Sequence, residues 1–273
     1  KVTTYLGGSL YKDKDEVEPL RTGAIDISSH TYSNWNAYVP ATEIWDVGGL
    51  FPGGWDQKLK VLDELMKVFD PELQAKAGVK QIGWLAYGDL GTLGNNARPI
   101  TKPEDLKGLK MRGISRRMAK WQESLGSSPA VISSAEVYTA LQRGTVEGAM
   151  SGSTTFTDRK WIEVVKHVTN VDGFAHMFFY IHMNKKRWDS MEPAAQQIVL
   201  QATREAQESA NKVALDEHKK AVQVIAQKTQ FVQLSADETK RVWAPTTKAV
   251  VEEYFKDSGS LGQQIKQLID RTS

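Results

Sequence analysis

The feature that most limits the fold of this chain is one long helical segment, residues 193–227. Ala, Gln, Glu and Lys dominate the segment, and all four are good helix formers. At 1.5 Å per residue the predicted helix is about 50 Å long. This exceeds the usual helix length of about 8 to 20 residues, so the helix can run across two domains. Its predicted apolar stripe consists of Ile198, Ala202, Ala206, Val213, Ala214, His218, Ala221 and Ile225.

Before this helix, short apolar runs alternate with amphipathic segments. Strands are predicted at residues 79–87 and 108–114, and helices at 59–69, 119–125 and 135–143. Such alternation favours an α/β fold with mainly parallel sheets. Thr101 and Glu104 match a capping box, which predicts that a short helix begins there.

Composition excludes several classes of function. Lys and Arg number 35 and Asp and Glu number 33, a formal net charge of +2 with scattered basic residues, so we expect no nucleic-acid partner. The absence of cysteine excludes disulfide scaffolds and cysteine-ligated zinc. No run of about 18 apolar residues occurs, which predicts that the chain does not span a membrane. The chain begins at Lys1 without a methionine, which we interpret as processing or trimming.

The motifs that suggest an enzyme lack their expected context. Ser9 and Lys12 match S-x-x-K, but the Ser-Asp-Asn and Lys-Thr-Gly motifs of acyl-enzymes are missing. His176 and His182 would lie about 20 Å apart on one strand, too far to share a metal ion. The glycines that follow Tyr87 lack the G-x-G-x-x-G spacing of dinucleotide sites. We therefore predict no enzyme activity, no cofactor and no metal.

Several blocks in a fixed order carry a family resemblance. They are TKPEDLKGLKMR at residues 101–112, LGSSP at 125–129, EVYTALQRGTVEG at 136–148, LRTGAIDI at 20–27 and NKKRWDS at 184–190. Together they resemble the periplasmic solute-binding proteins of TRAP transporters, the DctP-like family. Co-linear blocks over nearly the whole chain are far more specific than any single short motif.

The resemblance implies a two-lobed α/β architecture, a periplasmic-binding-protein-like (Venus-flytrap) fold that closes on a ligand, with the long helix spanning both lobes. The expected division assigns residues 1–88 and 177–216 to lobe I, and residues 89–176 and 217–273 to lobe II. Residues 2–7 resemble the family's second strand. The first strand and helix of lobe I are therefore expected to be absent from this chain.

The resemblance assigns the ligand carboxylate to Arg112, the arginine that ends the DLKGLK-x-R block. A guanidinium suits this role because its planar fork matches a carboxylate with two charge-assisted hydrogen bonds. From the residues alone, an ordinary surface ion pair is the alternative. Ser151 stands where many sugar-acid binders of the family have an asparagine, and Met150 offers a soft apolar surface. A second family arginine is missing near Thr92. Further expected ligand contacts are Ile114, Ser115, Tyr32, Trp35, Tyr87, Thr92 and Phe178.

Aromatic residues are plentiful near the expected cleft positions. Large flat side chains bury much apolar area and stack on rings. This favours a monocarboxylate ligand with an apolar or aromatic body over a polyhydroxylated sugar acid. The alternative is that most of these rings fill the core.

The family also implies partners and a compartment. The closed protein is expected to deliver its cargo to a small and a large membrane subunit, with uptake driven by an ion gradient. We expect a periplasmic monomer. A solute-binding protein of an ABC transporter, or a sensor domain, is the alternative, because both share the two-lobed architecture. A two-subunit permease beside the gene would support the TRAP type, whereas an ATPase would argue against it.

Overall fold

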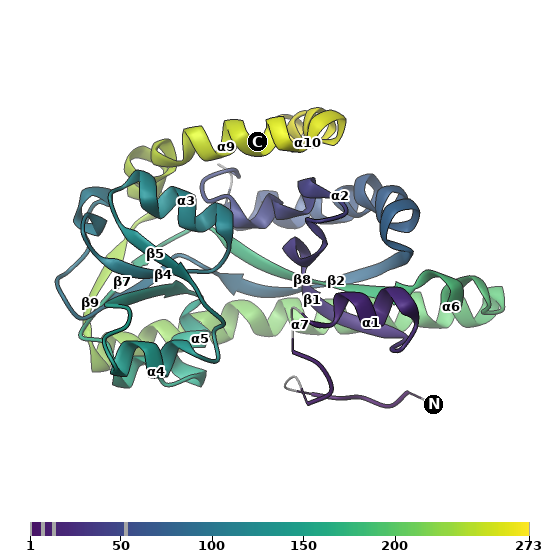
Figure 1. Ribbon diagram of the computed structural model, residues 1–273, viewed down its shortest axis with the longest axis horizontal. Coiled ribbons are helices and arrows are strands. Elements are labelled where there is room, and N and C mark those ends of the chain that lie inside the picture. Colours follow the sequence, from purple (N-terminus) through teal and green to yellow (C-terminus); the bar gives the residue numbers. More distant parts are fainter. Residues whose placement is uncertain (1, 7–8, 13–14, 52–53, 273) are drawn as a thin grey trace.

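The protein is described by a computed structural model that covers residues 2–6, 9–12, 15–51 and 54–272. These residues form two lobes, each built on one β-sheet (Figure 1). The first lobe has a three-stranded sheet of order β1-β8-β2, and the second lobe has a six-stranded sheet of order β5-β4-β6-β3-β7-β9. The strands are β1 (Ile27–Thr31), β2 (Val79–Asp89), β3 (Thr92–Asn95), β4 (Lys110–Gly113), β5 (Ser128–Val131), β6 (Gly148–Ser151), β7 (His167–Val171), β8 (His176–Asn184) and β9 (Gln230–Leu234).

The two sheets differ in strand direction. In the first sheet β8 pairs antiparallel with both β1 and β2. In the second sheet β4 is parallel to β5 and β6, and β7 is parallel to β9, while β3 is antiparallel to β6 and β7. The expectation of mainly parallel sheets is therefore wrong for the first lobe. The reason is that β8 comes from a distant part of the chain and lies between β1 and β2, a pairing that local sequence does not reveal.

Helices cover both faces of the sheets. Figure 1 shows α7 running beneath both lobes, with α9 and α10 along the opposite side. The α-helices are α1 (Val17–Thr22), α2 (Gly54–Ala77), α3 (Arg116–Ser124), α4 (Val137–Gln142), α5 (Ser153–Asp158), α6 (Lys185–Asp189), α7 (Pro193–Lys228), α8 (Ala236–Glu238), α9 (Lys248–Asp257) and α10 (Gly259–Thr272). The shorter segments are η2 (Tyr32–Trp35), η3 (Pro40–Asp46), η4 (Pro103–Leu106), η5 (Trp161–Glu163), η6 (Thr239–Trp243) and η7 (Ala244–Thr247).

The long helix α7 confirms the predicted segment, but its buried face differs from the predicted stripe. Its buried residues are Thr203, Ala214, Ala221 and Ile225. Ile198 is 70% exposed and Val213 is 53% exposed, and Ala202 and Ala206 are exposed as well, so the predicted stripe is wrong at these four positions. Close packing explains the use of small and polar residues, because a Cβ atom added to Gly83 of β2 would lie 2.2 Å from Thr203 Cγ2.

The N-terminal segment does not form the expected strand. Residues 2–6 have no regular secondary structure and are exposed, and Gly7 lies outside the described residues. The first sheet therefore begins with β1, which pairs only with β8 among the described strands.

The expected capping interaction at residues 101–104 is made by the residue next to Glu104. The carboxylate of Asp105, not that of Glu104, accepts hydrogen bonds from the backbone N–H groups of Thr101 at 2.8 Å and Lys102 at 3.1 Å. The segment that follows is the 3-10 turn η4, whose tighter winding brings the third helical residue back to the start. The short helix is thus confirmed and its capping side chain is wrong by one position.

The core consists of two apolar clusters, and the larger one joins the lobes. The larger cluster begins in the first lobe and continues into the second through Met118 and Trp121 of α3, while the smaller one lies within the second lobe around Phe156 and Trp161. Contact of this extent means that the lobes pack directly against each other. None of the described helices combines the length and apolar character that spanning a bilayer requires.

Candidate functional site

Arg112 lies in β4, a strand flanked on both sides in the second sheet. Its register partners are Ala130 of β5 and Ala149 of β6. The residue is only 5% exposed. Its guanidinium donates from Nε to the carbonyl of Ile132 at 3.1 Å and from Nη1 to the carbonyl of Met150 at 2.9 Å. Both partners are neutral backbone groups, so neither compensates the charge.

The positive charge of Arg112 has no carboxylate partner within the described part of the chain. None of the ion pairs found there includes it. Burial lowers the pKa of Arg112 to about 10, and the positive charge of Arg159 acts in the same direction. An isolated buried cation is costly unless an anion pairs with it. The electrostatics of this position therefore favour an anionic ligand.

A row of hydroxyl groups lies beside Met150. Ser151 Oγ donates to Thr155 Oγ1 at 3.2 Å, and the Tyr87 hydroxyl contacts the same Thr155 oxygen. Gly152 lets these elements approach, because an added Cβ would lie 2.7 Å from the Asp89 carbonyl oxygen and 3.0 Å from Tyr87 Cε1. The row can donate and accept hydrogen bonds next to the buried guanidinium. Thr155 was missed from the sequence, since nothing in the spacing marks where β6 turns into α5.

Thr92 lies directly opposite Ser151 in the β3–β6 pair. Its hydroxyl donates to Asn170 Oδ1 of β7 at 3.1 Å, and the residue is fully buried. The Thr92 side chain thus has an internal partner, and Asn170 is a neighbour that sequence reasoning did not identify.

Ile114 and Ser115 follow β4 directly, as expected. Both are partly buried, and Ser115 caps α3 by accepting a hydrogen bond from the Met118 N–H at 3.3 Å. Ser115 also lies beside Asp46 of η3: burial raises the pKa of Asp46 to about 7, while hydrogen bonds from Ser115 and Ser33 act in the opposite direction. This brings an acid of the first lobe close to the end of the Arg112 strand.

Three of the expected aromatic contacts lie in the interior of the first lobe. Tyr32 stacks on Tyr180 with 3.9 Å between ring centroids, and Trp35 donates from Nε1 to His182 Nδ1 at 3.3 Å. Phe178 packs against Trp45 at 4.6 Å. This placement matches the alternative that these rings fill the core. Tyr87 differs, because it is partly exposed and belongs to the hydroxyl row.

A second polar cluster occupies the junction where β2 and β8 meet the second lobe. Lys58 Nζ contacts His176 Nδ1, and Asp89 pairs with His176 across the β2–β8 ladder. Burial lowers the pKa of Lys58 to about 7 and raises that of Asp89 to about 8. The cluster adjoins the hydroxyl row, because Gly152 touches the Asp89 backbone. No sequence motif predicted it.

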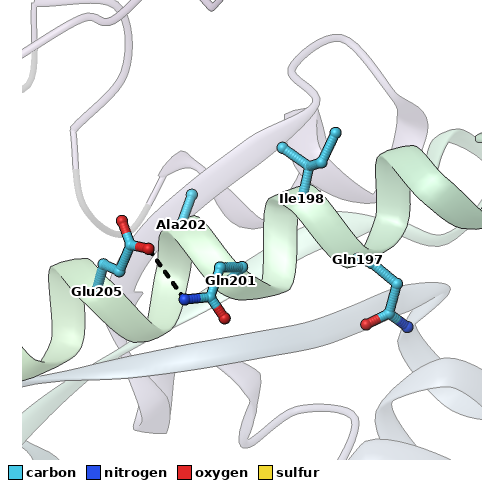
Figure 2. Close-up of a pocket in the computed structure, with 5 residues that line it drawn as sticks. All are labelled: Gln197, Ile198, Gln201, Ala202 and Glu205. Carbon is cyan, nitrogen blue, oxygen red and sulfur yellow. Dashed lines mark hydrogen bonds between the residues drawn. The ribbon is translucent and has the colours of Figure 1, made fainter.

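A surface hollow on α7 has a different character. It has a volume of about 400 Å³ and is shown in Figure 2. Its lining residues are Gln197, Ile198, Gln201, Ala202 and Glu205. It presents one face of a single helix and lacks a buried charge, so it is a poor candidate for holding an anion. Within the described residues, no group of three or more His, Cys, Asp or Glu side chains could hold a metal ion.

Comparisons with known proteins identify the family of the chain. Residues 1–258 match the DctP family, described as "Bacterial extracellular solute-binding protein, family 7". The chain is 31% identical over 268 residues to the C4-dicarboxylate-binding periplasmic protein DctP of Rhodobacter capsulatus, a match that covers 95% of this chain and 78% of that protein. It is 32% identical over 202 residues to a solute-binding protein of Albidiferax ferrireducens, covering 70% of this chain and 56% of that one.

Two solved structures have the same fold. A TRAP periplasmic solute-binding protein from Rhodoferax ferrireducens with bound malonate gives a TM-score of 0.87 at 25% identity, covering 97% of this chain and 84% of that chain. A TRAP periplasmic solute-binding protein from Sulfurospirillum deleyianum with bound succinate gives 0.83 at 26% identity, with the same coverage of 97% and 84%.

Proposed function

The chain belongs to the DctP family of bacterial extracellular solute-binding proteins, and we propose that it captures a small organic acid between its lobes for uptake by a TRAP transporter. It is a transport protein and not an enzyme. Proteins of this family bind small carboxylates and work with membrane permeases. In this chain we assign the binding of the ligand carboxylate to Arg112.

The single observation that carries the proposal is the buried and uncompensated charge of Arg112. Its two hydrogen bonds go to neutral carbonyls, and it forms no ion pair with the described residues. A ligand carboxylate supplies the missing negative charge and matches the geometry of the guanidinium fork. Exclusion of water as the lobes close strengthens the pair, because the local dielectric constant falls.

The hydroxyl row is proposed to contact the rest of the ligand. Ser151, Thr155 and Tyr87 offer hydroxyl groups there. The finer idea of an aromatic or apolar body draws support from the partly exposed Tyr87 ring. It draws none from Met150, Tyr32, Trp35 and Phe178, which are buried in the apolar core.

We further propose that the loaded protein docks on the small and large membrane subunits of a TRAP transporter, as a periplasmic monomer. Two solved relatives support the ligand class, because one holds bound malonate and the other bound succinate. The experiment that tests the proposal is a thermal-shift screen with malonate, succinate, D-glucuronate and benzoate. A ligand that binds only the folded state raises the melting temperature by mass action.

The expected result is a clear shift with at least one carboxylate, lost in Arg112→Ala and partly retained in Arg112→Lys. Truncating one partner of a buried charge pair costs about 2–5 kcal/mol, so affinity should fall roughly 30-fold or more. Arg143→Ala is the matched control, since Arg143 is an exposed arginine of the same lobe. Binding that survives unchanged in Arg112→Ala would refute the assignment of this site.

A further inference from the structure

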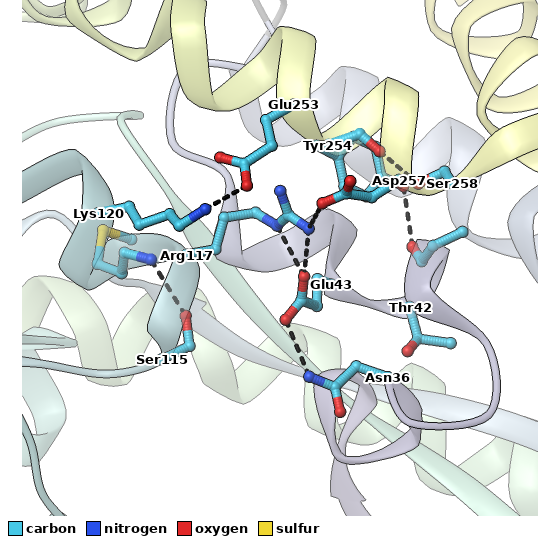
Figure 3. A network of polar contacts seen from close by, with 12 residues as sticks. Asn36, Thr42, Glu43, Ser115, Arg117, Lys120, Glu253, Tyr254, Asp257 and Ser258 are labelled. Carbon is cyan, nitrogen blue, oxygen red and sulfur yellow. Dashed lines mark hydrogen bonds and ion pairs between the residues drawn. The ribbon is translucent and has the colours of Figure 1, made fainter.

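A polar network joins the two lobes at a distance from the hydroxyl row. Figure 3 shows Arg117 of α3 between Glu43 of η3 and Asp257 of α9. Arg117 donates from Nε to Glu43 Oε2 at 2.8 Å, its Nη2 contacts the same oxygen, and Nη2 also donates to Asp257 Oδ2 at 3.2 Å. The other Glu43 oxygen accepts from Asn36 Nδ2 at 2.9 Å. Both charges are therefore paired and hydrogen-bonded.

The pair is buried and links elements of different lobes. Glu43 is 7% exposed and Arg117 is 4% exposed. Segment η3 packs on β8 and η2 of the first lobe, whereas α3 packs on β4 and β5 of the second lobe. The pair thus spans the contact between the lobes. A rotation that moves α3 away from η3 would separate these two side chains.

The same network connects to the strand of Arg112. Helix α3 begins at Arg116, directly after Ser115 and the end of β4, so Arg117 is five positions beyond Arg112 in the sequence. Helix α9 reinforces the junction from outside, because the Tyr254 hydroxyl donates to the Ala41 carbonyl at 2.9 Å. Movement of α3 relative to η3 would therefore move the end of the strand that carries the proposed carboxylate site.

We infer that Glu43 and Arg117 are positioning residues that form the latch of the closed state, an ion pair made when the lobes close and broken when they open. The inference rests on the proposed function, because it assumes that the chain opens and closes around a ligand. A latch of this kind acts through charge balance. With both partners present the closed state is fully paired. Without Arg117, closure buries Glu43 with no cation beside it, whereas without Glu43 the Arg117 guanidinium keeps only its bond to Asp257.

The chain offers a clean way to measure closure, since it contains no cysteine. Ala37→Cys and Glu123→Cys place spin labels at two exposed positions, one beside η3 and one on α3. Pulsed electron–electron double resonance then gives the distribution of distances between the two spin labels. Each distribution is recorded without ligand and again with 10 mM succinate as the probe, a concentration of roughly the order that a weak ligand requires.

The labelled variants are Glu43→Gln, Arg117→Met, and the double variant with both changes. Lys120→Met is the matched control, because Lys120 pairs with Glu253 of α9 and makes no contact with Glu43 among the contacts described. Arg117→Met should lose at least about half of the short-distance population, because closure then buries Glu43 without a cation. Glu43→Gln should lose less, because Arg117 keeps Asp257. The double variant should recover part of it, because no lone charge remains.

Four outcomes would overturn the inference. One is a short-distance population that is unchanged in both single variants, with their folding verified by melting temperature. Another is an equal loss in Lys120→Met. The third is a wild-type protein that shows only the long distance in both conditions, because the contacts of Figure 3 would then not form. If Arg117→Met does not fold, Arg117→Lys keeps the charge and should give an intermediate population, whereas a wild-type distribution would contradict the latch. The distance distributions without ligand test the latch even if succinate does not bind. Failure of the latch can therefore be distinguished from failure of the proposed function, which the ligand screen tests.

Discussion

Arg112 sits in mid-strand with two carbonyl partners and no carboxylate among the described residues. From its local sequence alone, an exposed ion pair was the simpler reading, because most arginines lie at the surface. The order of flanking blocks instead assigned it to the ligand, and its burial agrees with that assignment. Thr155 and Asn170 could not be found in this way. Their contacts with Ser151 and Thr92 depend on how β6, β3 and β7 are placed in the sheet.

Substitution of Arg112 should separate binding from stability. Arg112→Met removes a buried cation that lacks a counter-charge, so we expect the melting temperature of the ligand-free protein to stay within about 5 °C of wild type or to rise. The melting-temperature increase caused by the best carboxylate should disappear. Differential scanning calorimetry with and without that carboxylate checks both points. A large loss of stability with binding intact would mean that Arg112 has a structural role instead.

The Lys58–Asp89 junction predicts opposite pH effects for two substitutions. The pKa of Asp89 is raised from 3.8 to about 8 in the folded state, so its contribution to stability falls as pH rises through that window. The pKa of Lys58 is lowered from 10.5 to about 7, so its contribution is present at high pH and is lost as pH falls toward 7. Wild type therefore loses stability as pH rises from about 5 to about 8, and Asp89→Asn does not, so the stability of the variant relative to wild type should rise over this range.

Lys58→Met supplies the contrast at this junction. It should lose stability relative to wild type as pH rises from about 7 to 10, because the variant lacks the contribution that Lys58 regains there. Urea denaturation at a series of pH values measures both differences. Parallel stability curves for wild type and both variants would contradict the assigned directions.

At the scale of elements, the sequence predicted the length of α7 closely because its composition is uniformly helix-forming. The face that α7 buries was harder to predict. Only part of a helix that spans two lobes touches each of them, and Ile198 lies on a stretch that faces solvent. The antiparallel strand directions of the first sheet also could not be predicted from local sequence patterns. Strand β8 inserts between β1 and β2 from a position far along the chain.

The contact between Gly83 and Thr203 should limit substitution at this interface. A Cβ on Gly83 would lie 2.2 Å from Thr203 Cγ2, so Gly83→Ala should destabilise the protein by about 1–3 kcal/mol through overpacking. Adding Thr203→Ser removes that methyl group and keeps the hydroxyl that donates to the Val199 carbonyl. Urea denaturation should show that the double variant recovers most of the loss. A double variant as unstable as Gly83→Ala would place the strain elsewhere.

At the scale of the whole molecule, the two-lobed fold was predicted and is confirmed by the solved relatives. The lobe boundaries at residues 88/89, 176/177 and 216/217 remain a prediction. The contacts between lobes were not predictable, because Glu43 and Arg117 are 74 positions apart and no motif links them. Ligand capture requires both a strand that carries one uncompensated charge and lobes that close over it.

The central claim is that Arg112 binds the carboxylate of the ligand. The most direct test is isothermal titration of the acid with the largest thermal shift, compared with its uncharged primary amide, in wild type and Arg112→Ala. We predict that wild type binds the acid and not the amide, and that Arg112→Ala binds neither with measurable affinity. Equal binding of the acid to both proteins, or equal binding of acid and amide to wild type, would contradict the claim.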